Sequence, residues 1–138
     1  SGTVIKSEIT QRHGLPVFIR KENQIMVSIM PRDFSFVMGD YLSRIFCLFM
    51  QHGIRVSLVK ASAVSISVCI DDDRMKVDSV MKDLNPEFNI VYNENVELLT
   101  VRHYTAEAVN KITINREILL EQRSRNTVRF VVRKTGQE

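Results

Sequence analysis

The sequence predicts an α+β protein: antiparallel sheets with helices on one face, formed by one complete β-α-β-β-α-β unit and one abbreviated unit. Three observations predict this class. Short runs of alternating apolar and polar residues, such as 64–70, recur along the 138-residue chain. Segments between these runs carry apolar residues at the three- and four-residue spacing of a helix with one buried face. Glycine, asparagine and proline lie at most of the boundaries.

The first strands and the first helix are predicted from the pattern between residues 17 and 53. Strands are expected at 17–21 and 24–30, with a break at Glu22–Asn23. A helix follows, for which Asp33 or Ser35 is the expected N-cap. Its buried face is expected to consist of six apolar side chains, Met38, Tyr41, Leu42, Ile45, Phe46 and Phe49.

The rest of the first unit follows the same logic. Strands are expected at 54–59 and 64–70, and the acidic run Asp71–Asp73 is expected to start a helix rather than bind a metal. A fourth strand is expected from Phe88 to Tyr92, which closes a β-α-β-β-α-β unit of the ferredoxin-like type. The helix that follows the acidic run carries a stripe of apolar side chains, Val77, Val80, Met81 and Leu84.

The C-terminal part predicts a second unit that is one strand and one helix short. Strands are expected at 96–103, 118–122 and 127–133, with a short helix at 106–112. The strand at 17–21 is expected to supply the missing strand, which would interlock the two units.

The domain organisation follows from this interlocking. Residues 1–23 are assigned to an N-terminal segment that adds a strand to the second unit, 24–94 to the first unit and 95–138 to the second.

Composition and charge exclude several classes of protein. The chain is 44% apolar and 25% charged, and it has no apolar run near the roughly 20 residues that a membrane span needs. Residues 1–8 have no signal-peptide pattern, so a cytoplasmic protein without a membrane partner is expected. The net charge of +3 is too small to indicate nucleic-acid binding. Nor do Ser65, Ser67 and Cys69 supply the base-stacking aromatics of an RNA-binding sheet.

Candidate catalytic and metal-binding groups are sparse. Cys47 and Cys69 lack a ligand spacing, and both are expected to be buried thiols. His13, His52 and His103 are far apart in sequence, and no pair of nucleophile and base can be placed together. No catalytic residue, metal site or cofactor is therefore predicted on this chain.

Four stretches resemble one known family. In Gln51–Ser67 the run I-R-V-S-L-V-K-A-S-A-V-S-I-S resembles, without a gap, the pattern I-x-V-D-L-I-x-T-S-E-V-S-V-S of the aspartate kinases. Gly2–Ile5 resembles the G-T-x-I that follows the kinase domain in that family. Asn95–Val101 and Gln122–Val132 resemble the first strand and the hairpin of its second ACT unit. The resemblance spans nearly the whole chain and implies tandem ACT domains of the C-terminal regulatory region.

This resemblance implies a regulatory function. Aspartate kinases phosphorylate aspartate with ATP and Mg²⁺ in the first step toward lysine, threonine and methionine. Their ACT domains bind an end product and inhibit the kinase. The chain is thus expected to be a non-catalytic regulatory part that forms homodimers through its ACT domains, and its kinase domain lies outside this sequence.

The resemblance also implies an effector site. Backbone N–H groups at the start of the first helix are expected to hold the carboxylate of an amino acid, because a helix N-terminus carries unsatisfied donors. Side chains at the start and end of the next strand are expected to contact its amino end. The effector-binding residues predicted in this way are Phe36, Gly39, Asp40, Tyr41, Ser57 and Ser62.

Departures from the family pattern bear on the effector. Ser57 replaces the usual Asp, Lys60 and Ala61 replace two threonines, and Ala63 replaces a Glu. Without that Asp, no carboxylate pairs the ε-ammonium of lysine, and Lys60 repels it. Two alternatives therefore remain: a pocket for another amino acid, threonine being the natural candidate, or a purely structural dimer contact.

Two surface features complete the predictions. The first helix has more apolar residues than one core face needs, and Phe36, Val37, Leu48 and Phe49 are consistent with a dimer interface. Four arginines alternate along the last hairpin, a spacing that lets all of them point from one face: Arg123, Arg125, Arg129 and Arg133. A solvated edge or a contact to the kinase domain is expected there.

Overall fold

The computed structural model describes residues 15–33 and 38–134. Within these ranges the chain forms six strands and three helices, β1 (Val17–Pro31), α2 (Met38–Gln51), β2 (Val56–Ala61), β3 (Ile66–Asp71), α3 (Arg74–Leu84), β4 (Phe88–Arg102), α4 (Ala106–Thr113), β5 (Arg116–Arg123) and β6 (Thr127–Lys134). The predicted cap Ser35 lies outside the described residues.

The chain divides into two compact units that share two long strands. The central unit is Asn23–Val96, and the split unit is Ser1–Glu22 together with Glu97–Glu138. Strand β1 begins in the split unit and continues into the central unit, whereas β4 begins in the central unit and continues into the split unit. The two units are therefore interlocked through these strands.

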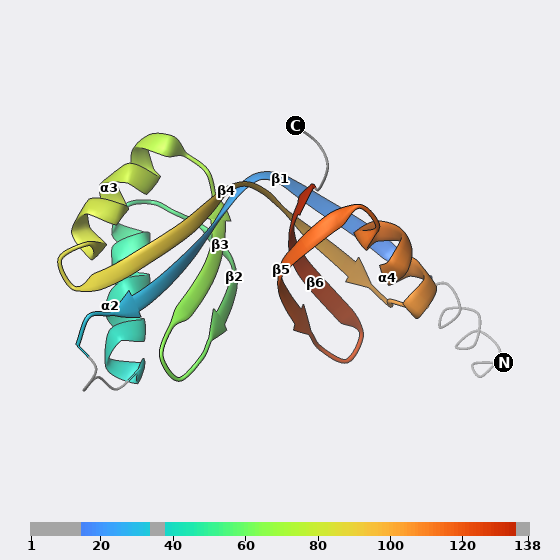
Figure 1. The fold of residues 1–138 in the computed structure, drawn as a ribbon, viewed down its shortest axis with the longest axis horizontal. Helices are drawn as coiled ribbons and strands as arrows, with labels where there is room; N and C mark the ends of the chain where they lie inside the picture. The colour runs from blue at the N-terminus through green and yellow to red at the C-terminus, as the bar shows by residue number, and fades with distance from the viewer. Residues whose placement is uncertain (1–14, 34–37, 135–138) are drawn as a thin grey trace, which may run out of the picture. The chain divides into compact units, whose positions relative to one another are not determined.

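The central unit has the predicted β-α-β-β-α-β arrangement. Its strand order is β2-β3-β1-β4, and β3 pairs antiparallel with both β1 and β2. Helices α2 and α3 lie on one face of this sheet (Figure 1). Between them and the sheet lies a core of buried side chains that includes Ile25, Val27, Ile29, Ile45, Phe49, Ile66, Val68, Ile70, Val77, Val80, Leu84 and Phe88. The predicted ferredoxin-like fold class is confirmed.

Glycine 53 ends α2 and explains why β2 begins later than predicted. Gly53 has a φ of 69°, a left-handed conformation that favours glycine, and its N–H donates to Met50 O at 3.0 Å. The N–H of Ile54 donates to Phe49 O at 2.9 Å. Ile54 therefore completes the helix end instead of starting the strand, and β2 begins at Val56.

The split unit repeats this sheet with one helix among the described residues. Its strand order is β1-β4-β6-β5, so β1 supplies the strand that the sequence of this unit lacks. Thr105 caps α4 by accepting a hydrogen bond from Ala108 N at 3.1 Å. Under α4 lies a smaller core formed by Leu99, Val101, Ala108, Val128, Phe130 and Val132. None of the three described helices is long and apolar enough to cross a membrane.

A charged network ties β1 into the split unit. Arg20 Nη2 lies 2.7 Å from Glu97 Oε2, which joins β1 to β4. The other oxygen of Glu97 lies 4.0 Å from Arg116 Nε on β5, and Arg116 Nη1 donates to Ile112 O at 2.6 Å. Glu97 is only 15% exposed, so two arginines compensate a largely buried carboxylate.

Two strands are longer than predicted, because an asparagine in each adopts a left-handed conformation without ending the pairing. The predicted break at Glu22–Asn23 lies inside β1, and the predicted gap between Tyr92 and Val96 lies inside β4. Asn23 has a φ of 58° and Asn95 a φ of 57°. Asparagine tolerates this region better than most residues, so the strand bends locally and continues.

Substitution of Asn95 tests this backbone conformation. Asn95→Val is expected to lower the free energy of unfolding by about 1–2 kcal/mol, because a β-branched residue is strained at positive φ. Asn95→Gly is expected to be nearly neutral at the same exposed position, because glycine adopts positive φ without steric strain. Urea denaturation of both variants measures the difference. Equal destabilisation by Val and Gly would contradict the backbone explanation.

The expected burial is wrong for one of the two cysteines. Cys47 is exposed, because it lies on the side of α2 away from Ile45 and Phe49, whereas Cys69 is buried as expected. Met26 and Gln24 are also buried on the sheet face that carries Cys69. Gln24 remains satisfied because its amide donates to Asp71 Oδ1 at 2.8 Å. The alternation pattern cannot by itself distinguish an exposed sheet face from one lined by small and sulfur-containing side chains.

Candidate functional site

Gly39 and Asp40 lie at the start of α2, where the sequence places the effector carboxylate. Phe36 lies outside the described residues. Gly39 lies in the first turn, and a Cβ added there would meet no atom within 4 Å. Asp40 is exposed in the same turn, where its negative charge favours the positive end of the helix dipole. This helix end therefore offers backbone donors beside one carboxylate.

Tyr41 points toward the core instead of a ligand. Its ring meets Phe88 edge-on, with ring centroids 5.4 Å apart and planes at 81°. The guanidinium of Arg44 lies 5.5 Å from the centre of the same ring. These contacts fix the first turns of α2 against the sheet.

Ser62 organises the β2–β3 turn. Its hydroxyl oxygen accepts hydrogen bonds from Val64 N at 3.3 Å and Ser65 N at 3.1 Å. Its backbone N–H donates to Ser65 O at 2.8 Å. The side chain is exposed but serves the turn, as serine commonly does.

Ser57 lies at a β-bulge. Val56 pairs with Ile70 and Leu58 with Cys69, so Ser57 is the extra residue of β2. A bulge redirects a side chain, and Ser57 is half-buried there. The alternating pattern did not predict this bulge, because one additional residue leaves the apolar spacing of such a short strand almost unchanged.

One chain does not bring all the predicted site residues together. Ala61 pairs with Ile66, which pairs with Ile29 near the start of the connection to α2. Ser62 and the beginning of α2 therefore lie at the same end of the sheet. Ser57 lies five residues along β2, roughly 16 Å away at strand spacing. The predicted site is thus divided between the two ends of an edge strand.

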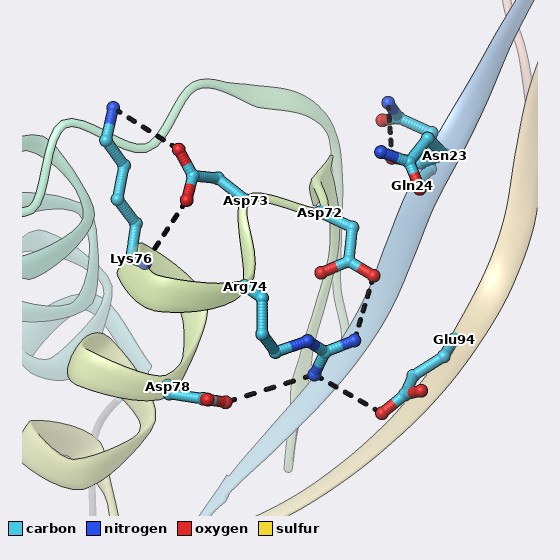
Figure 2. Close-up of polar contacts among 8 residues, drawn as sticks. All are labelled: Asn23, Gln24, Asp72, Asp73, Arg74, Lys76, Asp78 and Glu94. Atoms are coloured by element: carbon cyan, nitrogen blue, oxygen red, sulfur yellow. Dashed lines mark hydrogen bonds and ion pairs between the residues drawn. The ribbon is translucent and has the colours of Figure 1, made fainter.

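The acidic run before α3 caps that helix, as predicted. Asp73 is the N-cap and accepts a hydrogen bond from Lys76 N at 3.5 Å. Figure 2 shows Asp72 and Asp73 turned to different partners, since Asp72 lies 2.9 Å from Arg74 and Asp73 contacts Lys76. Asp71 accepts a hydrogen bond from the amide of Gln24. In the part of the chain that the structure describes, no three His, Cys, Asp or Glu residues are grouped to hold a metal ion.

Arg74 joins the start of α3 to β4. Its guanidinium lies 3.3 Å from Glu94 and 3.9 Å from Asp78, in addition to Asp72 (Figure 2). Desolvation opposes the charge, but these carboxylates outweigh it and raise the pKa of Arg74 above its usual value. The cluster explains the acidic run as a structural feature.

The β2–β3 and β5–β6 hairpins are built alike. In the second hairpin Ser124 N donates to Thr127 O at 2.8 Å, as Ser62 N does to Ser65 O in the first. Strand β5 also carries a bulge, between Ile118 and Leu120. The two units therefore present the same loop with different side chains.

The four arginines of the last hairpin do not share one face. Arg123 lies over the ring of Tyr104, 5.3 Å from its centre, and pairs with Glu121. Arg129 and Arg133 alternate with the buried Val128, Phe130 and Val132, so they lie on the opposite face of the sheet. The prediction of a common face is wrong for Arg123. Arg123 pairs across the hairpin with the buried Val128 and therefore lies on the α4 side of the sheet.

A further cavity lies between α2 and α3 and was not predicted. It has a volume of about 330 Å³ and is lined by residues of both helices and the start of β4, namely Arg44, Cys47, Leu48, Gln51, Asp83, Glu87 and Phe88. Arg44 and Glu87 form an ion pair at this cavity, and His52 lies 2.7 Å from Asp83 beside it. None of the predicted effector residues lines this cavity.

Several solved structures similar to this chain are aspartate kinases or regulatory parts of them. E. coli aspartokinase III in complex with lysine and aspartate matches 83% of this chain with a TM-score of 0.65 and 17% identity. A C-terminal regulatory domain of aspartate kinase from Porphyromonas gingivalis W83 matches 87%, with a TM-score of 0.67 and 16% identity. The regulatory subunit of aspartate kinase from Thermus flavus matches 83%, with a TM-score of 0.56 and 9% identity. The chain has the fold of aspartate kinase regulatory domains.

The extent of these matches is informative. The chain covers 28% of the E. coli aspartokinase III chain, but 86% of the P. gingivalis regulatory domain. No protein-family model and no curated protein matches the sequence. The structural matches confirm the tandem, interlocked ACT fold that the sequence resemblance predicts.

Proposed function

We propose that the chain is the allosteric regulatory module of an aspartate kinase and binds an end-product amino acid at a dimer interface. The interlocked pair of ACT units, shared with aspartate kinase regulatory domains, is the observation that carries this proposal. In the complete protein, a kinase domain would phosphorylate aspartate with ATP and Mg²⁺. Effector binding to this module would inhibit that reaction.

Strand β2 supports a dimeric site. It is an edge strand of the described sheet, and edge strands pair readily with a second chain. A two-fold axis beside Val59 would set β2 antiparallel to its copy. Ser57 of one chain would then lie beside Ala61 of the partner subunit, near the start of the partner's α2. Pairing of two copies would reunite the two halves of the site.

The chemistry of this site favours threonine over lysine. The N–H groups at the start of α2 suit the carboxylate of an amino acid, and Asp40 provides a negative charge for its ammonium group. Ser57 can hydrogen-bond a hydroxyl but cannot neutralise an ε-ammonium. Lys60, exposed on the same strand, further disfavours a cationic side chain.

Calorimetric titration of the chain with threonine, lysine and methionine tests the proposal. Threonine is expected to bind, with lysine at least about tenfold weaker because it lacks a counter-charge, a difference of roughly 1.4 kcal/mol. Ser57→Ala is expected to weaken threonine binding while leaving the melting temperature unchanged. Flat traces for all three amino acids at millimolar concentration would contradict the sensor function.

The alternative is a structural dimerisation module without a ligand. The edge position of β2 favours a structural dimer as much as an effector-binding dimer, because strand pairing between two copies requires no effector. Phe49, expected both on the buried face of the helix and at a dimer interface, lies in the core, which weakens the apolar-helix argument for this alternative. A dimer by light scattering combined with flat calorimetric traces would select it.

A further inference from the structure

The cavity between α2 and α3 of the central unit is not used by the predicted effector site. Its volume of about 330 Å³ is within the range of cavities that hold small ligands. We propose that this cavity binds a small aliphatic amine through its ammonium group. The proposal concerns a separate set of residues and does not depend on the proposed function.

One side of α2 forms a wall of the cavity. Arg44, Cys47, Leu48 and Gln51 recur at three- and four-residue spacing, so they share one side of the helix. Leu48 packs against the core of the central unit, and Phe88, at the start of β4, is 2% exposed. These two side chains give the cavity an apolar part that the alkyl chain of a ligand can contact.

The cationic side chain of the cavity lining is already held. Arg44 Nη2 donates to both carboxylate oxygens of Glu87, and the guanidinium lies 5.5 Å from the centre of the Tyr41 ring. Arg44 and Glu87 therefore compensate each other. An anionic ligand would have to displace Glu87 before it could bind the guanidinium.

Asp83 and Gln51 keep hydrogen-bond acceptors for a ligand. Oδ2 of Asp83 lies 2.7 Å from Nε2 of His52, but no hydrogen bond or ion pair with any described residue engages Oδ1. Gln51 donates from Nε2 to Cys47 Sγ at 3.6 Å, and its Oε1 likewise has no partner within the described ranges. The cavity lining therefore offers a carboxylate oxygen and an amide oxygen.

These acceptors suit an ammonium group, which has three N–H donors and no acceptor. Hydrogen bonds to a charged group are roughly twice as strong as neutral ones. Gln51 is in the last turn of α2 and Asp83 in the last turn of α3, where the helix dipole favours a cation, and the last turn of α2 has no basic residue. The carboxylate of an amino acid would be repelled by Asp83 and Glu87. The cavity therefore favours a simple amine over an amino acid.

Cys47 makes binding measurable in the full chain. It lines the cavity and is exposed, whereas Cys69 is fully buried. The rate at which dithiodipyridine modifies Cys47 at about pH 8 reports on occupancy of the cavity, because access controls the reaction of a thiolate. Three probes of similar size are titrated at matched ionic strength: butylamine, butanol and butyrate. N-acetylcysteine is the control for direct effects of each probe on the reaction.

Butylamine is expected to slow the modification of Cys47 saturably. Butanol is expected to bind at least about tenfold more weakly, because it carries no charge, and butyrate is expected not to protect the thiol. Equal protection by butanol would make the cavity a purely apolar pocket and overturn the proposal. Stronger protection by butyrate would make Arg44 the anchor and overturn it as well, as would a modification rate that butylamine leaves unchanged.

Asp83→Asn and Asp78→Asn form a matched pair of variants. Both side chains are largely exposed on α3, 51% and 67% respectively, but Asp78 does not line the cavity. Asp83→Asn is expected to weaken butylamine binding at least about tenfold, and Asp78→Asn less than about twofold. Equal losses would reduce the effect to general charge and overturn the proposal.

Gln51→Glu is a second variant that keeps the proposal testable should Asp83→Asn fail to fold. It adds a carboxylate at the exposed end of α2, on the cavity wall. Butylamine is expected to bind at least about tenfold more tightly to this variant, because a second charged acceptor faces the ammonium group. An affinity equal to that of the parent chain would overturn the proposal.

Discussion

A Ser57→Asp chain is expected to bind lysine at least about tenfold more tightly than the parent chain. The new carboxylate would pair the ε-ammonium of lysine, and a hydrogen bond to a charged group contributes about 1.5–3 kcal/mol. The bulge at Ser57 places this half-buried side chain on an edge strand. Calorimetric titration with lysine measures the gain.

Ser57→Asn is the matched control for this substitution. Asparagine has nearly the same size as aspartate but carries no charge, so lysine affinity is expected to stay at the parent value. Threonine affinity is expected to fall in the aspartate variant, because the buried part of the site loses a hydroxyl donor. Equal lysine affinities for the Asp and Asn variants would remove Ser57 from the effector site.

Truncation of Phe49 is expected to cause the largest loss of stability. Phe49 is 1% exposed at the end of α2 and packs among the buried side chains of the central unit. Phe49→Ala is expected to lower the free energy of unfolding by about 3–5 kcal/mol, through lost apolar contact and a residual cavity. The corresponding fall in melting temperature is roughly 10 °C or more.

Met50→Ala is the control from the neighbouring position. Met50 is 78% exposed on the same helix, so its truncation is expected to change stability by less than about 0.5 kcal/mol. Denaturation followed by circular dichroism compares the two variants. A loss below 1 kcal/mol for Phe49→Ala, or an equal loss for Met50→Ala, would place the centre of the core elsewhere.

The fold could be predicted because apolar periodicity records which face of each element is buried. Ile25, Val27 and Ile29 alternate, and the structure buries all three beneath the helices. The backbone conformation of single residues within the strands was harder to predict from the sequence. A left-handed asparagine such as Asn95 looks like a strand break in sequence, but the pairing of neighbouring strands carries the strand through it.

The candidate site was harder to predict because it depends on register and on a second chain. Sequence similarity indicated Ser57 and Ser62, but it did not reveal that a bulge and a turn hold them at opposite ends of β2. Such a register follows from strand pairing between distant parts of the sequence, which composition and periodicity do not encode.

Light scattering with and without threonine is the most direct test of an amino-acid site shared by two copies. If both copies complete each site, threonine binds the dimer in preference to the monomer, and linkage requires it to stabilise the dimer. Saturating threonine is expected to lower the dimer dissociation constant at least about tenfold, or roughly 1.4 kcal/mol. A dissociation constant that is unchanged by saturating threonine would contradict the shared site.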